Sequence, residues 1–366
     1  MELRIDPWGQ ETIKEYEKLF EYFGIRPFKE VLPLIDKPHY YMTRGVIFGH
    51  RDFDKFWRLY KDNKKVAILT GLMPSGKFHM GHKMVIDQLV YYQNLGIDVY
   101  VVIADAEAYA VRKIPRKEVI EIGINEYVAN AIALGLDPKK TVFYFQTNQD
   151  PRYYRLIQMI SRKITLNELE AIYGELEPSK IISVLTQVID VTFLTHKQFG
   201  GYECILVPVG ADQDPHLRLA RDVAERFSEL GLKPPASTYH RFMTGLDGGK
   251  MSSSRPESAI FLTDSIKEAK HKVFKALTGG RATAEEQRRL GGQPEKCTVF
   301  ELYAYHLIQN DNELKKLYDS CKLGSMLCGE CKRRAAELLI KWLKDHQEKL
   351  AKAREIAKSL QLEPDF

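Results

Sequence analysis

Two short stretches of this 366-residue chain carry side chains suited to chemistry on phosphate. His79 and His82 follow an apolar run and a Pro-Ser-Gly turn, where the start of a helix offers unpaired backbone N–H groups to an anion. Their imidazoles can donate hydrogen bonds to phosphate oxygens as negative charge builds up in a transition state. Lys250 opens a Lys-Met-Ser-Ser-Ser loop behind glycines, where a lysine can close over a leaving pyrophosphate. Each stretch alone also fits a bland interpretation, a capped helix or a solvated loop.

The elements around the histidines predict an α/β fold with a parallel sheet. Short continuous apolar runs are typical of strands buried on both faces, and the first of them ends at Gly71. The order of strand, glycine-bearing loop, helix and strand is that of a Rossmann-like nucleotide fold. We expect strands at 66–69, 99–104, 141–146 and 203–209 and a helix at 81–95.

A second loop-to-helix junction follows Val209-Gly210, with Asp214 expected as N-cap and Pro215 in the first turn. Beyond residue 263 the patterns are almost only helical, including the basic stretch 331–358 and two capping-box pairs, Ser265 with Glu268 and Thr283 with Glu286. We therefore expect an N-terminal extension at 1–63, a Rossmann-like domain at 64–262 and a helical domain at 263–366.

Composition indicates a globular protein, and we expect it in the cytoplasm. Hydrophobic residues make up 44% of the chain, and no apolar run approaches the roughly 20 residues that cross a bilayer. The N-terminus lacks the apolar core of a signal peptide. The net charge is +5, and residues 261–366 hold 20 Lys and Arg against 16 Asp and Glu, which favours a polyanionic partner there.

Four of the five cysteines lie close together in the sequence. Cys297, Cys321, Cys328 and Cys331 could bring four thiolates onto one iron–sulfur cluster or one zinc ion, or could be ordinary buried thiols.

In this order, the histidine pair, the Lys250 loop and the stretch Gly210-Ala-Asp-Gln213 resemble the catalytic domain of class I aminoacyl-tRNA synthetases, in the tyrosyl and tryptophanyl branch. Flanking stretches resemble the archaeal and eukaryotic tryptophanyl-tRNA synthetases: Asp6-Pro7-Trp8, Arg44–Phe48 with His50–Asp52, Gly279–Arg281 with Glu285–Glu286, and Ser325–Glu330. The resemblance implies activation of tryptophan by ATP with Mg²⁺, transfer to tRNA, and a homodimer formed through an insertion at about 110–200. The alternatives are a tyrosyl enzyme and a non-catalytic tRNA-binding paralogue.

The resemblance also implies roles for individual residues. The catalytic residues are His79, His82 and Lys250. The ATP-binding residues are Pro74, Ser75, Gly76, Gly81, Gly210, Asp212, Met251, Ser252 and Ser253. The tryptophan-binding residues are Leu69, Gly71, Glu107, Tyr109, Gln187, Asp190 and Gln213.

Within the tryptophan set, Asp190 is expected as the main acceptor of the indole N–H, Gln187 at the amino group, and Glu107 and Tyr109 as further contributors. Leu69 stands where tyrosyl enzymes have a tyrosine, which opposes a tyrosyl enzyme.

Three features depart from or extend the family pattern. Ser253 replaces the usual second lysine of the loop, so Lys250 must carry more of the pyrophosphate contact or Lys77 must help. In the helical domain, anticodon bases would be read by chemistry such as that of Tyr303, Tyr305, Tyr318, Lys322 and residues 332–334. Some bacterial relatives carry a four-iron cluster on a similar cysteine spacing, which favours a 4Fe–4S cluster over zinc at the four cysteines.

Overall fold

The computed structural model describes residue 20 and residues 23–364. The expected Asp6-Pro7-Trp8 motif lies outside these residues. The chain divides into two compact units. Unit 1 comprises Met1–Ser75, Val85–Arg241 and Arg354–Phe366, and unit 2 comprises Gly76–Met84 and Phe242–Ala353.

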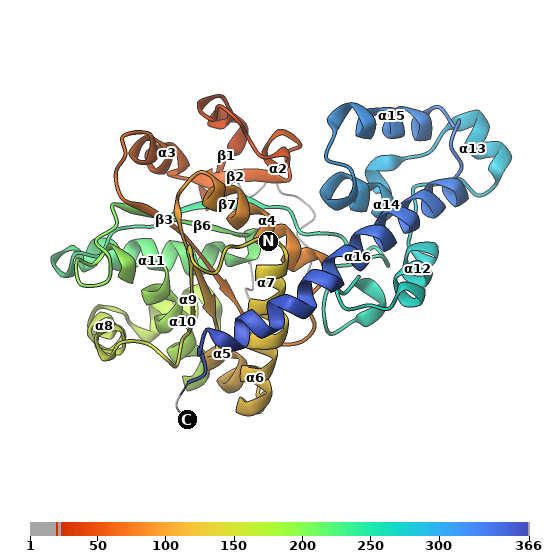
Figure 1. The fold of residues 1–366 in the computed structure, drawn as a ribbon. Helices are drawn as coiled ribbons and strands as arrows, with labels where there is room; N and C mark the ends of the chain where they lie inside the picture. The colour runs from red at the N-terminus through yellow and green to blue at the C-terminus, as the bar shows by residue number, and fades with distance from the viewer. Residues whose placement is uncertain (1–19, 21–22, 365–366) are drawn as a thin grey trace. The chain divides into compact units, whose positions relative to one another are not determined.

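A seven-stranded sheet forms the centre of unit 1 in the described part of the chain, in the order β1-β2-β7-β6-β3-β4-β5 (Figure 1). The five strands from β7 to β5 are parallel to one another, so the predicted parallel α/β fold is confirmed. The strands are β1 (Arg26–Pro27), β2 (Ile47–Arg51), β3 (Val66–Leu72), β4 (Asp98–Ile103), β5 (Thr141–Phe145), β6 (Cys204–Gly210) and β7 (Ala236–His240). Each of the four predicted strands corresponds to one of these within a few residues.

Two antiparallel strands extend the sheet, and the sequence did not predict them. β2 pairs with β7, and β1 pairs with β2, so part of the segment before residue 63 belongs to the sheet. The sequence also missed β7. Polar residues hid the pattern of β2 and β7, because His50 of β2 and Thr238 of β7 are fully buried although polar residues are more often exposed.

Helices cover both faces of the sheet. α3 contacts β3, β6 and β7, while α8, α10 and α11 share a hydrophobic core with residues of β3 and β6 such as Leu69 and Val207. The helices of unit 1 are α2 (Tyr40–Thr43), α3 (Phe53–Lys61), α4 (Met80–Asn94, which begins in unit 2), α5 (Asp105–Ala110), α6 (Arg116–Ile122), α7 (Ala129–Ala133), α8 (Pro151–Ile160), α9 (Leu166–Tyr173), α10 (Pro178–Asp190) and α11 (Asp214–Arg226).

The expectation that Asp214 is an N-cap is wrong. α11 begins at Asp214 itself, its N-cap is Gln213, and Pro215 lies in the first turn as expected. The Asp214 carboxylate is engaged by two arginines and by Tyr239 instead of the backbone of its own helix.

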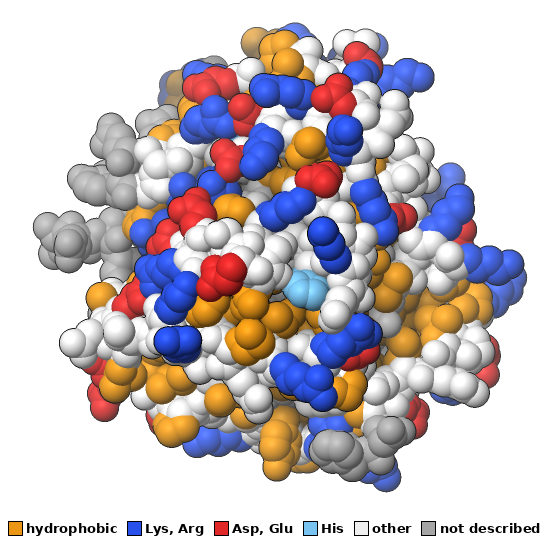
Figure 2. All heavy atoms as spheres, turned by 90° about the vertical axis from the view of Figure 1, so that its left-hand side faces the viewer, with side chains coloured by type: hydrophobic (Ala, Val, Ile, Leu, Met, Phe, Trp, Pro, Cys, Tyr) orange, Lys and Arg blue, Asp and Glu red, His pale blue; other side chains and the backbone are white. Residues whose placement is uncertain are grey.

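Acidic and basic side chains are mixed on the face of the molecule that Figure 2 shows. Lysines and arginines are interspersed there with aspartates and glutamates. Several oppositely charged residues of unit 1 pair directly: Arg226 with Glu168 at 2.6 Å, Lys233 with Glu203 at 2.7 Å, and Lys163 with Glu229 at 3.0 Å. Exposed pairs of this kind add little stability, because water and salt screen the two charges.

Unit 2 is helical beyond the loop that carries Lys250, as the sequence predicted. Ser265 and Glu268 form the expected capping box at the start of α12, and Thr283 accepts the N–H of Glu286 at 3.1 Å. The helices are α12 (Ile266–Lys275), α13 (Ala284–Leu290), α14 (Thr298–Leu302), α15 (Asp311–Lys322) and α16 (Cys328–Ser359, whose last residues belong to unit 1). Among the described helices, none is both long and apolar enough to cross a membrane.

Candidate active site

The two histidines form a compact turn at the start of α4, in unit 2. Their rings stack with centroids 3.8 Å apart. The Nδ1 of His79 accepts the N–H of Gly81 at 3.1 Å, and the Nδ1 of His82 accepts the N–H of His79 at 3.2 Å. Because each Nδ1 is an acceptor, a neutral ring carries its proton on Nε2. The turn therefore fixes Nε2–H as the donor atom of both imidazoles.

Both histidines are neutral near pH 7. Burial lowers the pKa of His82 to about 4, and burial, followed by the nearby His82 and Lys250, lowers the pKa of His79 well below its usual value. They can therefore serve as hydrogen-bond donors to phosphate, and not as permanent cations.

A short backbone pairing holds this turn against the segment after the Lys250 loop. The N–H of Met80 donates to the carbonyl of Ile260 at 3.1 Å, and the N–H of Leu262 donates to the carbonyl of Phe78 at 2.9 Å. His79 and Phe261 form an isolated antiparallel bridge between these contacts. The two motifs are thus tied together by main-chain hydrogen bonds within one unit.

The Lys-Met-Ser-Ser-Ser loop lies beside the residues that precede the histidines. The Oγ of Ser253 donates to the carbonyl of Lys77 at 3.1 Å, and a Cβ on Gly76 would lie 3.2 Å from the Cβ of Ser253. The Nζ of Lys250 lies 4.5 Å from the centroid of the Phe242 ring. Residues about 170 positions apart therefore share one site, with His79, Lys77 and the loop lysine in the same compact unit.

Gly81 is required by the histidine turn itself. A Cβ at position 81 would lie 2.9 Å from the Cε1 and 3.0 Å from the Nδ1 of His79, closer than real Cβ contacts. The resemblance to the family implied only that Gly81 binds ATP. Its first role is to make room for the His79 ring.

Other expected nucleotide-binding residues lie nearby in the chain and differ in exposure. Pro74 is buried and Ser75 is exposed, at the end of unit 1. In the loop, Met251 is buried with 5% of its surface exposed, while Ser252 is half-buried. Met251 therefore anchors the loop by its side chain, and the serines are accessible.

In unit 1, Asp190 is the centre of a buried hydrogen-bond network. It is 4% exposed and accepts from Tyr153 at 2.7 Å, from Gln146 at 2.7 Å and from Tyr144 at 3.1 Å. Two of these donors contact Oδ1 and one contacts Oδ2, and a carboxylate has about four acceptor sites. One acceptor site on Oδ2 thus remains for a further donor, as an indole N–H would be.

Burial dominates the acidity of Asp190. Loss of solvation raises its pKa to about 7, although the three donors oppose the rise. Asp105, which lies at the start of α5 and is also fully buried, adds repulsion. Asp105 itself accepts from Thr147 and lies 3.5 Å from Arg116.

The sheet register aligns the expected pocket residues. Gly71 is opposite Val102, and Val102 is opposite Tyr144, so the three lie in one row on the same face of the sheet. Leu69 shares that face two residues earlier and is 1% exposed. A Cβ on Gly71 would meet no atom within 4 Å, which leaves open space in this row.

Glu107 and Gln187 pair above that face, and Tyr109 is apart from them. The Nε2 of Gln187 donates to Glu107 at 2.7 Å, and Glu107 is 7% exposed. Tyr109 is 55% exposed on α5. Residues two apart on a helix face different ways, so the structure groups Glu107 with Gln187 and separates Tyr109.

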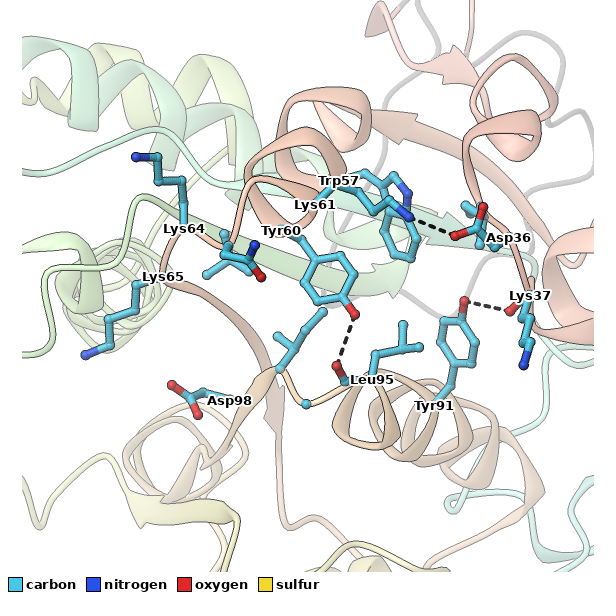
Figure 3. Close-up of a pocket in the computed structure, with 15 residues that line it drawn as sticks. Asp36, Lys37, Trp57, Tyr60, Lys61, Lys64, Lys65, Tyr91, Leu95 and Asp98 are labelled. Atoms are coloured by element: carbon cyan, nitrogen blue, oxygen red, sulfur yellow. Dashed lines mark hydrogen bonds and ion pairs between the residues drawn. The ribbon is translucent and has the colours of Figure 1, made fainter.

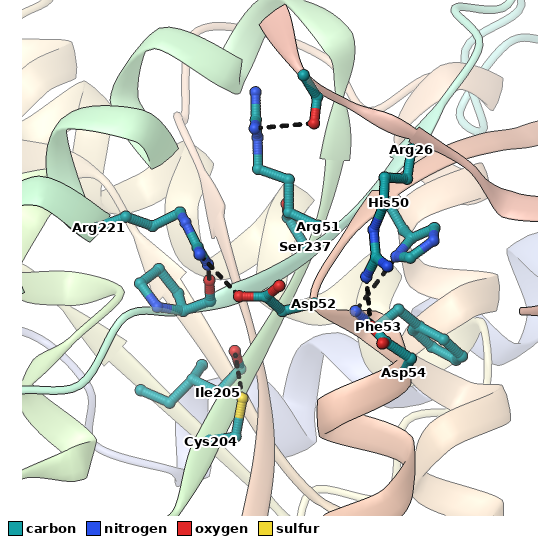
Figure 4. Close-up of polar contacts among 12 residues, drawn as sticks. Arg26, His50, Arg51, Asp52, Phe53, Asp54, Cys204, Ile205, Arg221 and Ser237 are labelled. Atoms are coloured by element: carbon teal, nitrogen blue, oxygen red, sulfur yellow. Dashed lines mark hydrogen bonds and ion pairs between the residues drawn. The ribbon is translucent and has the colours of Figure 1, made fainter. Parts of the chain in front are cut away.

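Gly210 is the last residue of β6. Asp212 and Gln213 lie in the short turn between β6 and α11. The next residue, Asp214, is fully buried and forms a bidentate pair with Arg51 of β2. Figure 4 shows Arg51 beside Asp52, which in turn pairs with Arg221 of α11 at 2.7 Å. Two ion pairs therefore fix the turn that carries Asp212 and Gln213.

The four clustered cysteines line one small cavity in unit 2. Its volume, about 20 Å³, is that of a single water molecule. Burial, followed by the neighbouring thiols, raises the pKa of Cys321 to about 11 and that of Cys331 to about 12. Four convergent thiols match the donor set of an iron–sulfur cluster or zinc, yet among the described residues no three His, Cys, Asp or Glu side chains are arranged to hold a single metal ion.

A pocket of about 630 Å³ lies around the amino ends of β3 and β4, at the opposite end of the parallel strands from Glu107 and Gly210 (Figure 3). Trp57 and Tyr60 of α3 and Tyr91 of α4 line it, together with lysines such as Lys64. In parallel sheets, ligands usually bind at the carboxyl ends of the strands. The pocket therefore lies away from Glu107 and Gly210, which mark those ends.

Sequence reasoning missed the residues that organise the site. Gln146 and Tyr153 hold Asp190, and Arg51 holds Asp214. A signal existed for Gln146, since it is a polar residue directly after a buried parallel strand, where functional side chains gather.

The fold, and the histidine turn joined to the Lys250 loop, are those of a class I aminoacyl-tRNA synthetase. The family model for class I tRNA synthetases of the tryptophan and tyrosine type matches residues 61–344. Over 96% of both chains, the sequence is 60% identical to the tryptophan–tRNA ligase of Hyperthermus butylicus, and over 99% of both it is 57% identical to that of Aeropyrum pernix. The crystal structure of the tryptophanyl-tRNA synthetase from Aeropyrum pernix superimposes with a TM-score of 0.92, covering 97% of this chain and 98% of that one. The chain belongs to the tryptophan and tyrosine branch of the class I tRNA synthetases.

Proposed function

We propose that the chain is a tryptophan–tRNA ligase that activates tryptophan with ATP and transfers the aminoacyl group to its tRNA. The observation that carries the proposal is the single unit formed by His79, His82 and Lys250, with both imidazoles fixed as Nε2–H donors. The names of the similar archaeal proteins favour tryptophan as the amino acid. We also propose that the protein acts in the cytoplasm.

In the first step, a carboxylate oxygen of tryptophan attacks the α-phosphorus of ATP, and the bond from that phosphorus to pyrophosphate breaks. No proton moves, so catalysis consists of positioning and charge stabilisation. His79 and His82 donate to the α-phosphate oxygens as charge builds up on them, and Lys250 follows the leaving pyrophosphate. Mg²⁺ neutralises charge on the phosphates when it is bound. In the second step, a terminal ribose hydroxyl of tRNA attacks the adenylate carbonyl carbon, and the bond from that carbon to the phosphate oxygen breaks. AMP leaves, and its phosphate takes the hydroxyl proton.

Lys77 is our proposal for the cation that the loop lacks at Ser253. The short Ser253 side chain donates to the carbonyl of Lys77, so the loop serine lies at the residue whose side chain can supply the charge. The remaining nucleotide contacts are assigned to Pro74, Ser75, Gly76, Gly81, Gly210, Asp212, Met251 and Ser252.

We propose that a row of apolar residues on the sheet, together with one buried hydrogen-bond acceptor, selects tryptophan. Asp190 accepts the indole N–H, while Glu107, Gln187 and Gln213 contact the amino acid backbone. Leu69 and Gly71 form the wall on the sheet. A tyrosine hydroxyl against Leu69 would lose its hydrogen bonds, which costs about 1–3 kcal/mol.

The helical part, residues 263–366, is proposed to receive the anticodon, with aromatic residues such as Tyr305 and Tyr318 stacking on bases. The enzyme is proposed to act as a homodimer through residues 110–200. The four cysteines are proposed to hold a 4Fe–4S cluster or zinc, which would cross-link α14, α15 and α16 and stabilise this unit. The cluster takes no part in the steps above.

Amino-acid-dependent exchange between ATP and pyrophosphate tests the proposal. Wild type should exchange with tryptophan and not with tyrosine. His82→Ala and Lys250→Ala should each lower the rate about 10²–10³-fold, as the loss of one preorganised donor does. Lys315→Ala, which removes an exposed lysine that pairs within α15, serves as the control. Exchange with tyrosine would favour the tyrosyl alternative, and no exchange with either amino acid would favour a non-catalytic tRNA-binding paralogue.

A further inference from the structure

We propose that Glu301 is a positioning residue that holds the Lys250 loop in place for the ATP-dependent step. This inference rests on the proposed function, because it assigns Lys250 to the pyrophosphate. Glu301 lies on α14, outside the motifs that identify the family branch.

The carboxylate of Glu301 binds Thr244 through two hydrogen bonds. Its Oε1 accepts the backbone N–H of Thr244 at 2.6 Å, and its Oε2 accepts the Thr244 hydroxyl at 2.7 Å. Charge-assisted hydrogen bonds of this length are the strong ones in proteins, and a bidentate arrangement fixes direction as well as distance. When ionised, the glutamate carboxylate has two acceptor oxygens, so it can accept both hydrogen bonds at once.

Thr244 is the partner of Lys250 across the loop. The two residues form an isolated antiparallel bridge, and the N–H of Met251 donates to the carbonyl of Met243 at 3.4 Å. The turn between them closes with the N–H of Gly245 on the carbonyl of Gly249 at 2.6 Å. Glu301 thus fixes one arm of a small hairpin whose other arm begins the Lys-Met-Ser-Ser-Ser loop.

The helix that carries Glu301 is itself tied to the same hairpin. The Thr298 hydroxyl, at the start of α14, donates to the carbonyl of Leu277 at 2.8 Å. The N–H of Leu277 donates to the carbonyl of Leu246, within the hairpin turn, at 2.7 Å. Because the hairpin is held from two sides, α14 sets the direction in which Lys250 leaves it.

A second contact steadies the far end of the loop. Arg255 pairs with Asp247 at 2.9 Å and donates to the carbonyl of Lys250. This latch lies within the loop, whereas the Glu301 contact joins the loop to a helix of the unit. The Glu301 contact, together with the Thr298–Leu277 link, therefore makes the position of Lys250 depend on the helical part.

Exchange kinetics at varied ATP and tryptophan test the inference. Glu301→Gln, which keeps the shape and loses the charge, and Thr244→Val, which keeps the N–H and loses the hydroxyl, should each lower kcat/KM for ATP about ten-fold, the effect of one charge-assisted hydrogen bond. Thr244→Ser should stay near wild type. The tryptophan dissociation constant without ATP and the melting temperature should change little in all three.

Two additions make the test specific. Glu313→Gln removes a carboxylate of the same unit that pairs with Arg334 and should leave the ATP kinetics unchanged. Trypsin should cut the Lys250–Met251 bond faster in Glu301→Gln than in wild type, while the bond after Arg255 resists because Pro256 follows.

The outcomes separate the two proposals. If wild type shows no exchange, the proposed function fails. If wild type exchanges, but Glu301→Gln and Thr244→Val leave kcat/KM for ATP and the cleavage at Lys250 unchanged, the positioning role fails alone. A parallel loss of tryptophan affinity and melting temperature would also overturn it, since Glu301 would then support the whole fold.

Discussion

Arg51 and Asp214 are joined by two hydrogen bonds, Nε to Oδ1 at 3.0 Å and Nη2 to Oδ2 at 3.1 Å. Only 13% of the Arg51 side chain and none of the Asp214 side chain is exposed. The pair connects an antiparallel strand near the N-terminus with the first residue of α11. Because Asp214 directly follows Gln213, this contact holds the end of the turn that carries Asp212 and Gln213.

Removing one partner of this pair should destabilise the protein strongly. Asp214→Asn leaves Arg51 without its charge partner in a buried place, which typically costs about 3–5 kcal/mol of the free energy of unfolding. Guanidinium chloride unfolding measures the loss. The matched variant Asp150→Asn disrupts an exposed pair with Arg152 and should cost far less, because water screens the two charges. Equal losses in the two variants would contradict the assignment.

Gly81→Ala should reduce activity by displacing the His79 ring. The new Cβ would lie 2.9 Å from that ring, so the imidazole must leave its stacked position and Nε2–H no longer points in its present direction. Misplacement of a catalytic group by about 1 Å can cost on the order of 10²-fold in rate. The measurement is kcat for exchange between ATP and pyrophosphate.

Gly329→Ala is the control for that variant, because a Cβ at position 329 of α16 meets no atom within 4 Å. It should keep full activity and be slightly more stable, as alanine favours a helix over glycine. Full activity in Gly81→Ala would show that the ring geometry is not needed.

Periodicity predicted four of the five parallel strands of the sheet, β3 to β6, and the capping chemistry predicted the start of α12. Apolar runs such as 203–209 are local signals, and so is the Ser265 capping box. β2 and β7 were missed because their polar residues are buried only through pairing with distant strands. A local pattern cannot contain that information.

The site shows the same difference between local sequence signals and contacts made by distant residues. The types and order of His79, His82 and Lys250 suggested phosphate chemistry before their positions were known. The supports of the site, Gln146 for Asp190 and Glu301 for the loop, carry no motif, since each acts through a contact far away in the sequence. The Asp214 cap was wrongly predicted for this reason, because distant arginines took its carboxylate.

After purification under anaerobic conditions, the protein should contain iron or zinc bound to the four cysteines. Removal of the metal should lower the melting temperature of the helical part. Burial and the neighbouring thiols raise the pKa of Cys321 and Cys331, because thiolates this close repel one another, and a bound cation relieves that repulsion. Elemental analysis of wild type and Cys331→Ser checks this, with Cys204→Ser, on β6, as the control. Metal-free wild type with an unchanged melting temperature would identify ordinary buried thiols.

Asp190 should make the stability of the protein depend on pH. Burial raises its folded pKa to about 7, above an unfolded value of about 3.9, so the folded state binds the proton more tightly. Its stabilising contribution is fully present below pH ~4 and is lost as pH rises through 7. The change is on the order of 4 kcal/mol, and Asp190→Asn should lack it in unfolding experiments at pH 4–8.

Tryptophan binding should change with pH in the opposite direction. The ionised carboxylate is the stronger acceptor for an indole N–H, so tryptophan affinity should rise as pH increases through about 7. Equilibrium dialysis between pH 5.5 and 8.5 measures this, and Asp190→Asn should bind more weakly with a flat profile. Tyr153→Phe removes one donor to the carboxylate and should move the midpoint of the rise to higher pH, since that donor favours the ionised form. A flat wild-type profile together with the unfolding slope would mean that Asp190 supports the fold without contacting the indole.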